Sequence, residues 1–123
     1  KLAEADADEL VMRKKLAQLA LAEKDYKAAA EWAEQAMHVD VMDVDVHRML
    51  AEAAANLRDH PRAIDHYETA VKLDPEQTGL WFALANACVD ADQLDKARDA
   101  LKALLKIDPE HIGATQLLEG LAP

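Results

Sequence analysis

The sequence holds few of the residues that make tight turns. Three glycines and four prolines in 123 residues are too few for the many chain reversals of an all-β fold, which depend on these residues. Aromatic residues make up only 4% of the chain, whereas alanine, the best helix former and a poor strand former, is abundant. These shortages favour an all-α fold.

Other absences concern the environment of the chain. The single cysteine, Cys88, excludes an internal disulfide and leaves the redox compartment open. No apolar run approaches the roughly 20 residues that span a bilayer, so we expect no membrane insertion. The sequence shows neither a signal peptide nor a starting methionine, and we expect Lys1 to be a cut within a longer chain. The compartment stays unknown, with the cytoplasm slightly favoured over the periplasm.

Basic charge is also scarce. The 24 acidic residues outnumber the 14 basic ones, which gives a formal net charge of −10. Nucleic-acid binding requires clusters of lysine and arginine, and anionic membrane surfaces attract basic segments. The charge therefore argues against both kinds of partner without identifying another.

Catalytic motifs are missing as well. The sequence contains no H-E-x-x-H pair, no paired nucleophile and base, and no glycine-rich phosphate loop. We therefore predict a protein that is not an enzyme, with no catalytic, cofactor-binding or metal-binding residues.

The sequence does contain an internal repeat. Pro75 and Pro109 occupy the same place in "KLDPE" and "KIDPE", and many alanines, leucines and aspartates recur at the interval that separates these two prolines. Three units result, at residues 10–43, 44–77 and 78–111. Residues 1–9 align with the tail of a preceding repeat, or form a linker. Residues 112–123 align with a further first helix, which Gly120 and Pro123 end early, and we predict a C-terminal capping helix there.

Each unit shows the pattern of two helices. Apolar residues recur at helical spacing on both sides of a central break. Asp25 and Asp59 directly precede the second helices of the first two units, where an aspartate can cap free N–H groups. Pro61 suits the first turn that follows. Asp43 is the expected cap of the first helix of the second unit.

These units resemble the tetratricopeptide repeat. The third unit matches the family pattern of its first helix with Trp81, Leu84, Ala85 and Cys88. Small residues replace the family's glycine and tyrosine, and Val41 replaces the proline of the first unit. The resemblance implies an all-α solenoid of three helix-turn-helix repeats, wound into a right-handed superhelix.

The resemblance also implies a function. Members of the family bind a peptide or protein segment in a concave groove lined by the first helices, so we expect a non-enzymatic interaction module. Asparagine and glutamine amides suit a peptide backbone, cations suit a carboxylate, and an aromatic ring suits an apolar anchor. Carried over position by position, the expected groove residues are Lys14, Gln18, Arg48, Glu52, Asn56, Phe82, Asn86 and Asp90.

One subclass of the family is not expected. Repeats that bind the C-terminal carboxylates of heat-shock chaperones use a clamp of lysine, asparagine and arginine side chains. Lys14 fits the first clamp position, but Gln18, Met49, Gly79 and Ala83 occupy the others.

Two alternatives remain open beside this hypothesis. The stretch "HVDVMDVDVH" could hold a metal ion through its histidines and aspartates, although the repeat places it at an ordinary junction between units. The chain could also be a structural, accessory or self-assembling domain of a larger, possibly enzymatic protein. Trp32 falls near the helix surface and could contact another domain of such a protein.

Overall fold

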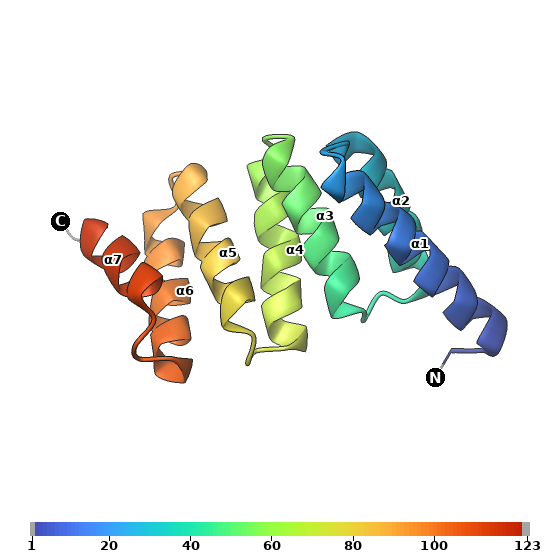
Figure 1. Cartoon of the computed structure of the whole chain (residues 1–123). Helices are drawn as coiled ribbons and strands as arrows, with labels where there is room; N and C mark the ends of the chain where they lie inside the picture. The colour runs from blue at the N-terminus through green and yellow to red at the C-terminus, as the bar shows by residue number, and fades with distance from the viewer. Residues whose placement is uncertain (1, 122–123) are drawn as a thin grey trace.

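The computed structural model describes residues 2–121, and all regular structure in that range is helical. This confirms the prediction of an all-α fold. The helices, shown in Figure 1, are α1 (Glu4–Ala22), α2 (Tyr26–Val39), α3 (Val44–Asn56), α4 (His60–Leu73), α5 (Thr78–Asp90), α6 (Leu94–Ile107) and α7 (Ile112–Gly120).

The helices stack in a row. Each of the pairs α1–α2, α3–α4 and α5–α6 is a helix-turn-helix unit, each pair packs on the next, and α7 packs on α6. The two ends of the chain lie at opposite ends of the row (Figure 1). The molecule is therefore an α-solenoid, as the repeat predicted. None of the helices within residues 2–121 is long and apolar enough to cross a membrane.

Aspartates begin three of the helices. The carboxylates of Asp25, Asp43 and Asp59 accept hydrogen bonds from backbone N–H groups three residues later, at 3.2, 3.0 and 3.4 Å. Each bond satisfies an N–H group that has no partner within its helix. The three predicted caps are confirmed.

Alanine fills the crossings between paired helices. Six alanines at matching positions of the three pairs have no exposed surface: Ala17, Ala29, Ala51, Ala63, Ala85 and Ala97. Such small side chains allow two helix axes to approach at the lower end of the usual 8–10 Å range. The buried residues form two clusters that meet in α3, where Leu50 belongs to one cluster and its neighbour Ala51 to the other.

Residues 4–9, which the repeat alignment assigned to a preceding repeat's tail or a linker, are helical. They continue into α1 without a break, and Asp6, which aligns with Asp40, lies within the first turn of α1. No proline or side-chain cap interrupts this stretch, and acidic residues stabilise the N-terminal turn of a helix. At the other end α7 stops at Gly120, as predicted, while Pro123 lies outside the described residues.

Each turn inside a helix pair uses a left-handed residue that is not glycine. Lys24, Arg58 and Asp92 have φ values of 61°, 68° and 59° and occupy the same position in their respective units. The N–H of the residue after each one donates a 2.8 Å hydrogen bond to a carbonyl near the end of the first helix. This is the usual way to close a helix C-terminus, where glycine is the favoured residue.

We therefore predict that Arg58→Gly stabilises the protein. The left-handed conformation destabilises an L-residue by about 1–2 kcal/mol, a cost that glycine does not have. Glycine in turn lowers the free energy of unfolding by roughly 0.5–1 kcal/mol, because it gives the unfolded chain more conformational freedom. The expected net gain is about 0.5–1 kcal/mol in the free energy of unfolding, measured by urea denaturation. Lys102→Gly, at an exposed position inside α6, is the control and should cost about 1 kcal/mol. Equal losses in both variants would contradict the role of the turn.

Candidate functional site

The first helices of the three pairs carry two adjoining hollows. One hollow of 190 Å³ lies between α1 and α3 and is lined by Lys14, Lys15, Gln18, Asp45, Arg48 and Met49. The other, of 250 Å³, lies between α3 and α5 and is lined by Arg48, Glu52, Tyr67, Gln77, Gly79, Leu80 and Ala83. Because Arg48 lines both, the two hollows adjoin, and we refer to them together as the groove.

Lys14 is held at one end of the groove by two carboxylates. Its ammonium Nζ lies 3.0 Å from Asp43 Oδ2 and 3.3 Å from Asp45 Oδ2. Partial burial acts to lower the pKa of Lys14, but the hydrogen bonds and charges of Asp43 and Asp45 together raise it. Asp43 thus caps α3 through one oxygen and binds α1 through the other. A ligand carboxylate would have to compete with both aspartates for Lys14.

Arg48 stands at the middle of the groove with looser partners. Its guanidinium nitrogens lie 3.9 Å from Asp45 Oδ1 and 3.9 Å from Glu52 Oε2. These distances bring the charges close but exceed hydrogen-bond length, so the Arg48 N–H groups retain capacity to donate. Of Lys14 and Arg48, Arg48 therefore has the weaker internal contacts.

Tyr67 reaches the groove from a second helix. It lies on α4 and is 7% exposed, yet it lines the hollow between α3 and α5. Burial, followed by the negative charge of Glu52, raises the pKa of Tyr67 to about 12. The phenol therefore stays protonated near neutral pH and keeps a hydrogen to donate.

Sequence reasoning missed Tyr67 because its position in the repeat indicates core. The signal that could have found it lies in α5, where Gly79 and Ala83 are small. At the equivalent positions of the preceding unit stand Asp45 and Met49, and Met49 is 2% exposed and fills the space. The small side chains of α5 leave Tyr67 as a wall of the hollow.

Four of the eight expected groove residues line the groove: Lys14, Gln18, Arg48 and Glu52. The other four, Asn56, Phe82, Asn86 and Asp90, line neither hollow. The side-chain amides of Asn56 and Asn86 donate to carbonyls one turn earlier in their own helices. Phe82 is half-buried, and its ring lies 5.2 Å from that of His111. The role of all eight in binding stays a prediction.

Comparison with protein families decides the assignment. The family model described as tetratricopeptide repeat matches residues 54–119, more than half of the chain. The chain belongs to the tetratricopeptide repeat family. No curated protein matches it, so sequence comparison adds no closer relative.

Several solved structures share the fold at low sequence identity. MamA aligns with a TM-score of 0.89 and 20% identity over 96% of this chain and 69% of its own. The second TPR domain of human RPAP3, in complex with an HSP70 peptide, aligns with a TM-score of 0.86 and 16% identity. The alignment covers 94% of this chain and 97% of that domain. O-GlcNAc transferase from Thermobaculum terrenum aligns with a TM-score of 0.82 and 18% identity. The alignment covers 98% of this chain but only 23% of the transferase chain.

The suspected aspartate ligands have other partners. Asp40 accepts a hydrogen bond from the Met42 N–H at 3.0 Å, and Asp43 caps α3. Among residues 2–121, no three side chains of histidine, cysteine, aspartate or glutamate come together in a way that could hold a metal ion. The stretch from His38 to His47 is the junction between two tetratricopeptide units.

His47 takes part instead in a pair with His66 of α4, in which His47 is buried and His66 half-buried. His47 is 4% exposed, and its Nε2 lies 2.6 Å from the Val41 carbonyl oxygen, which can only accept. Nε2 of His47 therefore carries a hydrogen, and in the tautomer with this hydrogen alone Nδ1 accepts. Since the two Nδ1 atoms are 3.1 Å apart, we assign the shared hydrogen to His66.

This pair predicts a loss of stability in weak acid. Burial, then the nearby charges of His47 and Arg62, lowers the pKa of His66 below its ordinary 6.5, against the opposing charges of Asp65 and Glu34. The folded chain thus binds this proton less readily than the unfolded chain. Stability from His66 is complete above pH 6.5 and falls as the pH drops below that value.

Urea denaturation at about pH 7.5 and about pH 5.5, on either side of the ordinary histidine pKa, tests this prediction. His66→Asn is the matched control, because its amide nitrogen takes the place of Nδ1 and can donate the same hydrogen bond but does not titrate. The wild type should lose more stability between the two pH values than the asparagine variant. Equal losses would show that the pair does not sense protons.

Proposed function

We propose that this tetratricopeptide repeat protein is an interaction module that binds a peptide or extended protein segment in the groove of α1, α3 and α5. The observation that supports this best is the hollow between α3 and α5. It joins apolar surface from Leu80 and Ala83 to polar groups of Arg48, Tyr67 and Gln77. One apolar side chain of a ligand fits such a hollow, while the polar groups bind the backbone beside it.

The charges of the groove give an acidic segment little advantage. Of its three cations, Lys14 and Arg48 already lie beside carboxylates and the exposed Lys15 forms no ion pair within residues 2–121, while Asp45 and Glu52 are at least 44% exposed as side chains. An acidic peptide would meet these carboxylates in a protein whose net charge is −10. Together with the missing clamp residues, this argues against the acidic chaperone tails that structural neighbours bind.

A second proposal is an accessory role in a larger protein. It is supported by the aligned transferase, because the region that matches this chain makes up only 23% of that larger chain. The exposed Met12 and Leu19 of α1, at 53% and 56%, offer apolar surface for another domain. Sedimentation of the isolated chain distinguishes self-assembly from a monomeric module, because only self-assembly depends on protein concentration.

Ala83→Met tests the groove. Methionine is the residue that fills the equivalent place in the preceding unit, and it should close the hollow without adding charge. Peptides selected from a random library on the wild type should bind Ala83→Met at least about tenfold more weakly, equivalent to about 1.4 kcal/mol. Fluorescence anisotropy of the labelled peptides gives the dissociation constants.

Two further measurements make this test specific. Lys102→Met adds the same side chain at an exposed site on α6 and should leave affinity unchanged. The HSP90 peptide SRMEEVD, which binds the first TPR domain of Spaghetti, should bind this protein more weakly than the selected peptides do. Unchanged affinity of every selected peptide for Ala83→Met would refute binding in this hollow.

A further inference from the structure

Two different side chains of the first helices, on the side that faces the second helices, make the same hydrogen bond in successive units. Trp81 occupies the position that His47 occupies one unit earlier. The indole Nε1 donates to the Pro75 carbonyl at 2.8 Å, as His47 Nε2 donates to the Val41 carbonyl at 2.6 Å. The indole is thus held in place by the junction before α5.

The two rings are covered differently. Over His47 lies the ring of His66, with 5.3 Å between ring centroids. The residues of α6 that correspond to His66 and Thr69 are Ala100 and Ala103, whose methyl groups cannot cover Trp81 in the same way. An ion pair crosses the second helices in both places, Glu34 to Arg62 at 3.2 Å and Glu68 to Lys96 at 3.7 Å. The backbone arrangement is repeated, and the covering ring is missing.

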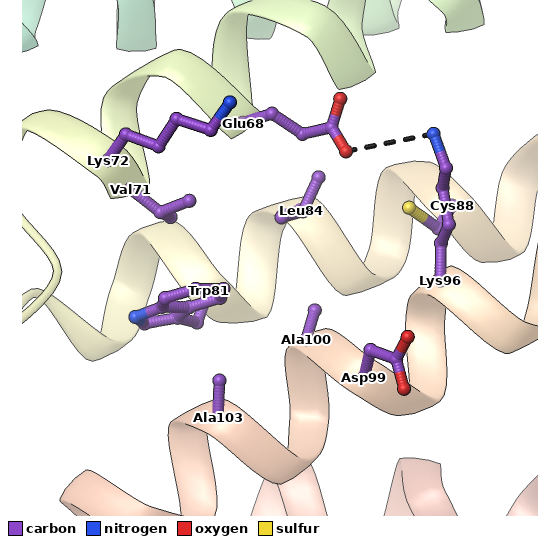
Figure 2. Close-up of a pocket in the computed structure, with 10 residues that line it drawn as sticks. All are labelled: Glu68, Val71, Lys72, Trp81, Leu84, Cys88, Lys96, Asp99, Ala100 and Ala103. Atoms are coloured by element: carbon purple, nitrogen blue, oxygen red, sulfur yellow. Dashed lines mark ion pairs between the residues drawn. The ribbon is translucent and has the colours of Figure 1, made fainter.

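A pocket of 470 Å³ results between α4, α5 and α6 (Figure 2), which we call the α4–α6 pocket. Val71, Trp81 and Leu84 provide apolar walls, and the two alanines of α6 lie opposite them. The volume lies within the range of ligand sites, which are mostly apolar with a few polar groups. It shares no lining residue with the groove.

The rim adds a charge pattern. Glu68 and Lys96 pair with each other across the pocket, as the dashed line in Figure 2 marks. Lys72 on α4 and Asp99 on α6 form no ion pair with any residue in the range 2–121, and both are exposed. An occupant with one carboxylate and one cation beside its apolar group therefore complements the two sides of the mouth.

We propose that the α4–α6 pocket is a second binding site, which takes an aromatic side chain of a different protein, flanked by one acidic and one basic residue. The His66 ring shows that a flat ring fits against the equivalent position, and aromatic rings pack favourably against an indole. A second copy of this chain is a poor occupant. All five of its aromatic side chains are buried or half-buried.

Nuclear magnetic resonance of the ¹⁵N-labelled protein tests this site directly. The probe is the blocked tripeptide acetyl-Glu-Phe-Lys-amide, with acetyl-Glu-Ala-Lys-amide as its matched control, each added to about 10 mM because a single side chain supports only millimolar affinity. The phenylalanine probe should shift the Trp81 indole and the Ala100 and Ala103 amides in a saturable way. The Trp32 indole, on α2, should stay in place, and the alanine probe should cause no such shifts.

Ala100→His combined with Ala103→Thr gives the pocket the residues of the preceding unit and should weaken probe binding at least about tenfold. If the double variant does not fold, Ala103→Met serves the same purpose. Ala83→Met, which closes the groove, should bind the probe like the wild type. A probe with glutamine on both sides of phenylalanine should bind roughly two- to tenfold more weakly, since exposed ion pairs contribute little each.

Several results would overturn the proposal. Equal shifts with the alanine probe would remove the aromatic requirement, and unchanged binding by the filled variants would place the probe elsewhere. Loss of probe binding in Ala83→Met but not in the filled variants would assign the probe to the groove. Shifts of the Trp81 indole that follow protein concentration alone would make a second copy of the chain the occupant.

Discussion

Close contact between paired helices is the constraint on which the structure depends. Each helix pair contributes two alanines without exposed surface, such as Ala51 of α3 and Ala63 of α4, which belong to the same buried cluster. Any larger side chain there would push the helices apart and shift every contact further along the stack. Because the crossing recurs once in every unit, the pairs adopt the same geometry, and each new pair finds a matching surface on the previous one.

A repeated backbone leaves individual side chains to create differences between units. Met49 of α3 is buried, whereas the smaller Ala83, at the equivalent position of α5, lines a hollow. His66 covers His47, whereas Ala100 leaves Trp81 uncovered. The hollow between α3 and α5 and the α4–α6 pocket therefore each arise from a small residue in one unit where another unit has a large one. The binding surfaces come from departures within the repeat.

The sequence predicted whatever depends on the spacing of its own residues. The helix pairs and the caps Asp25, Asp43 and Asp59 follow from local pattern, and the structure confirms them. The extension of α1 through residues 4–9 was not predicted, because alignment to later units imposed a junction that these residues have no proline or cap to form. The carboxylate partners of Lys14 and the place of Tyr67 in the wall of the groove depend on distances between helices, which residue spacing does not contain.

The groove and the α4–α6 pocket meet at α5 without sharing a side chain. Ala83 of α5 lines the groove, while its neighbours Trp81 and Leu84 line the pocket. Residues two positions apart point to different sides of a helix, so a ligand on one face leaves the other face open. Asp90 is the single charged residue of α5. Between α5 and α6, Ala85 and Ala97 have no exposed surface, so the two helices pack closely. A helix fixed in this way can support two occupants at once, and the bulk of a residue on one of its faces can be changed without reshaping the other.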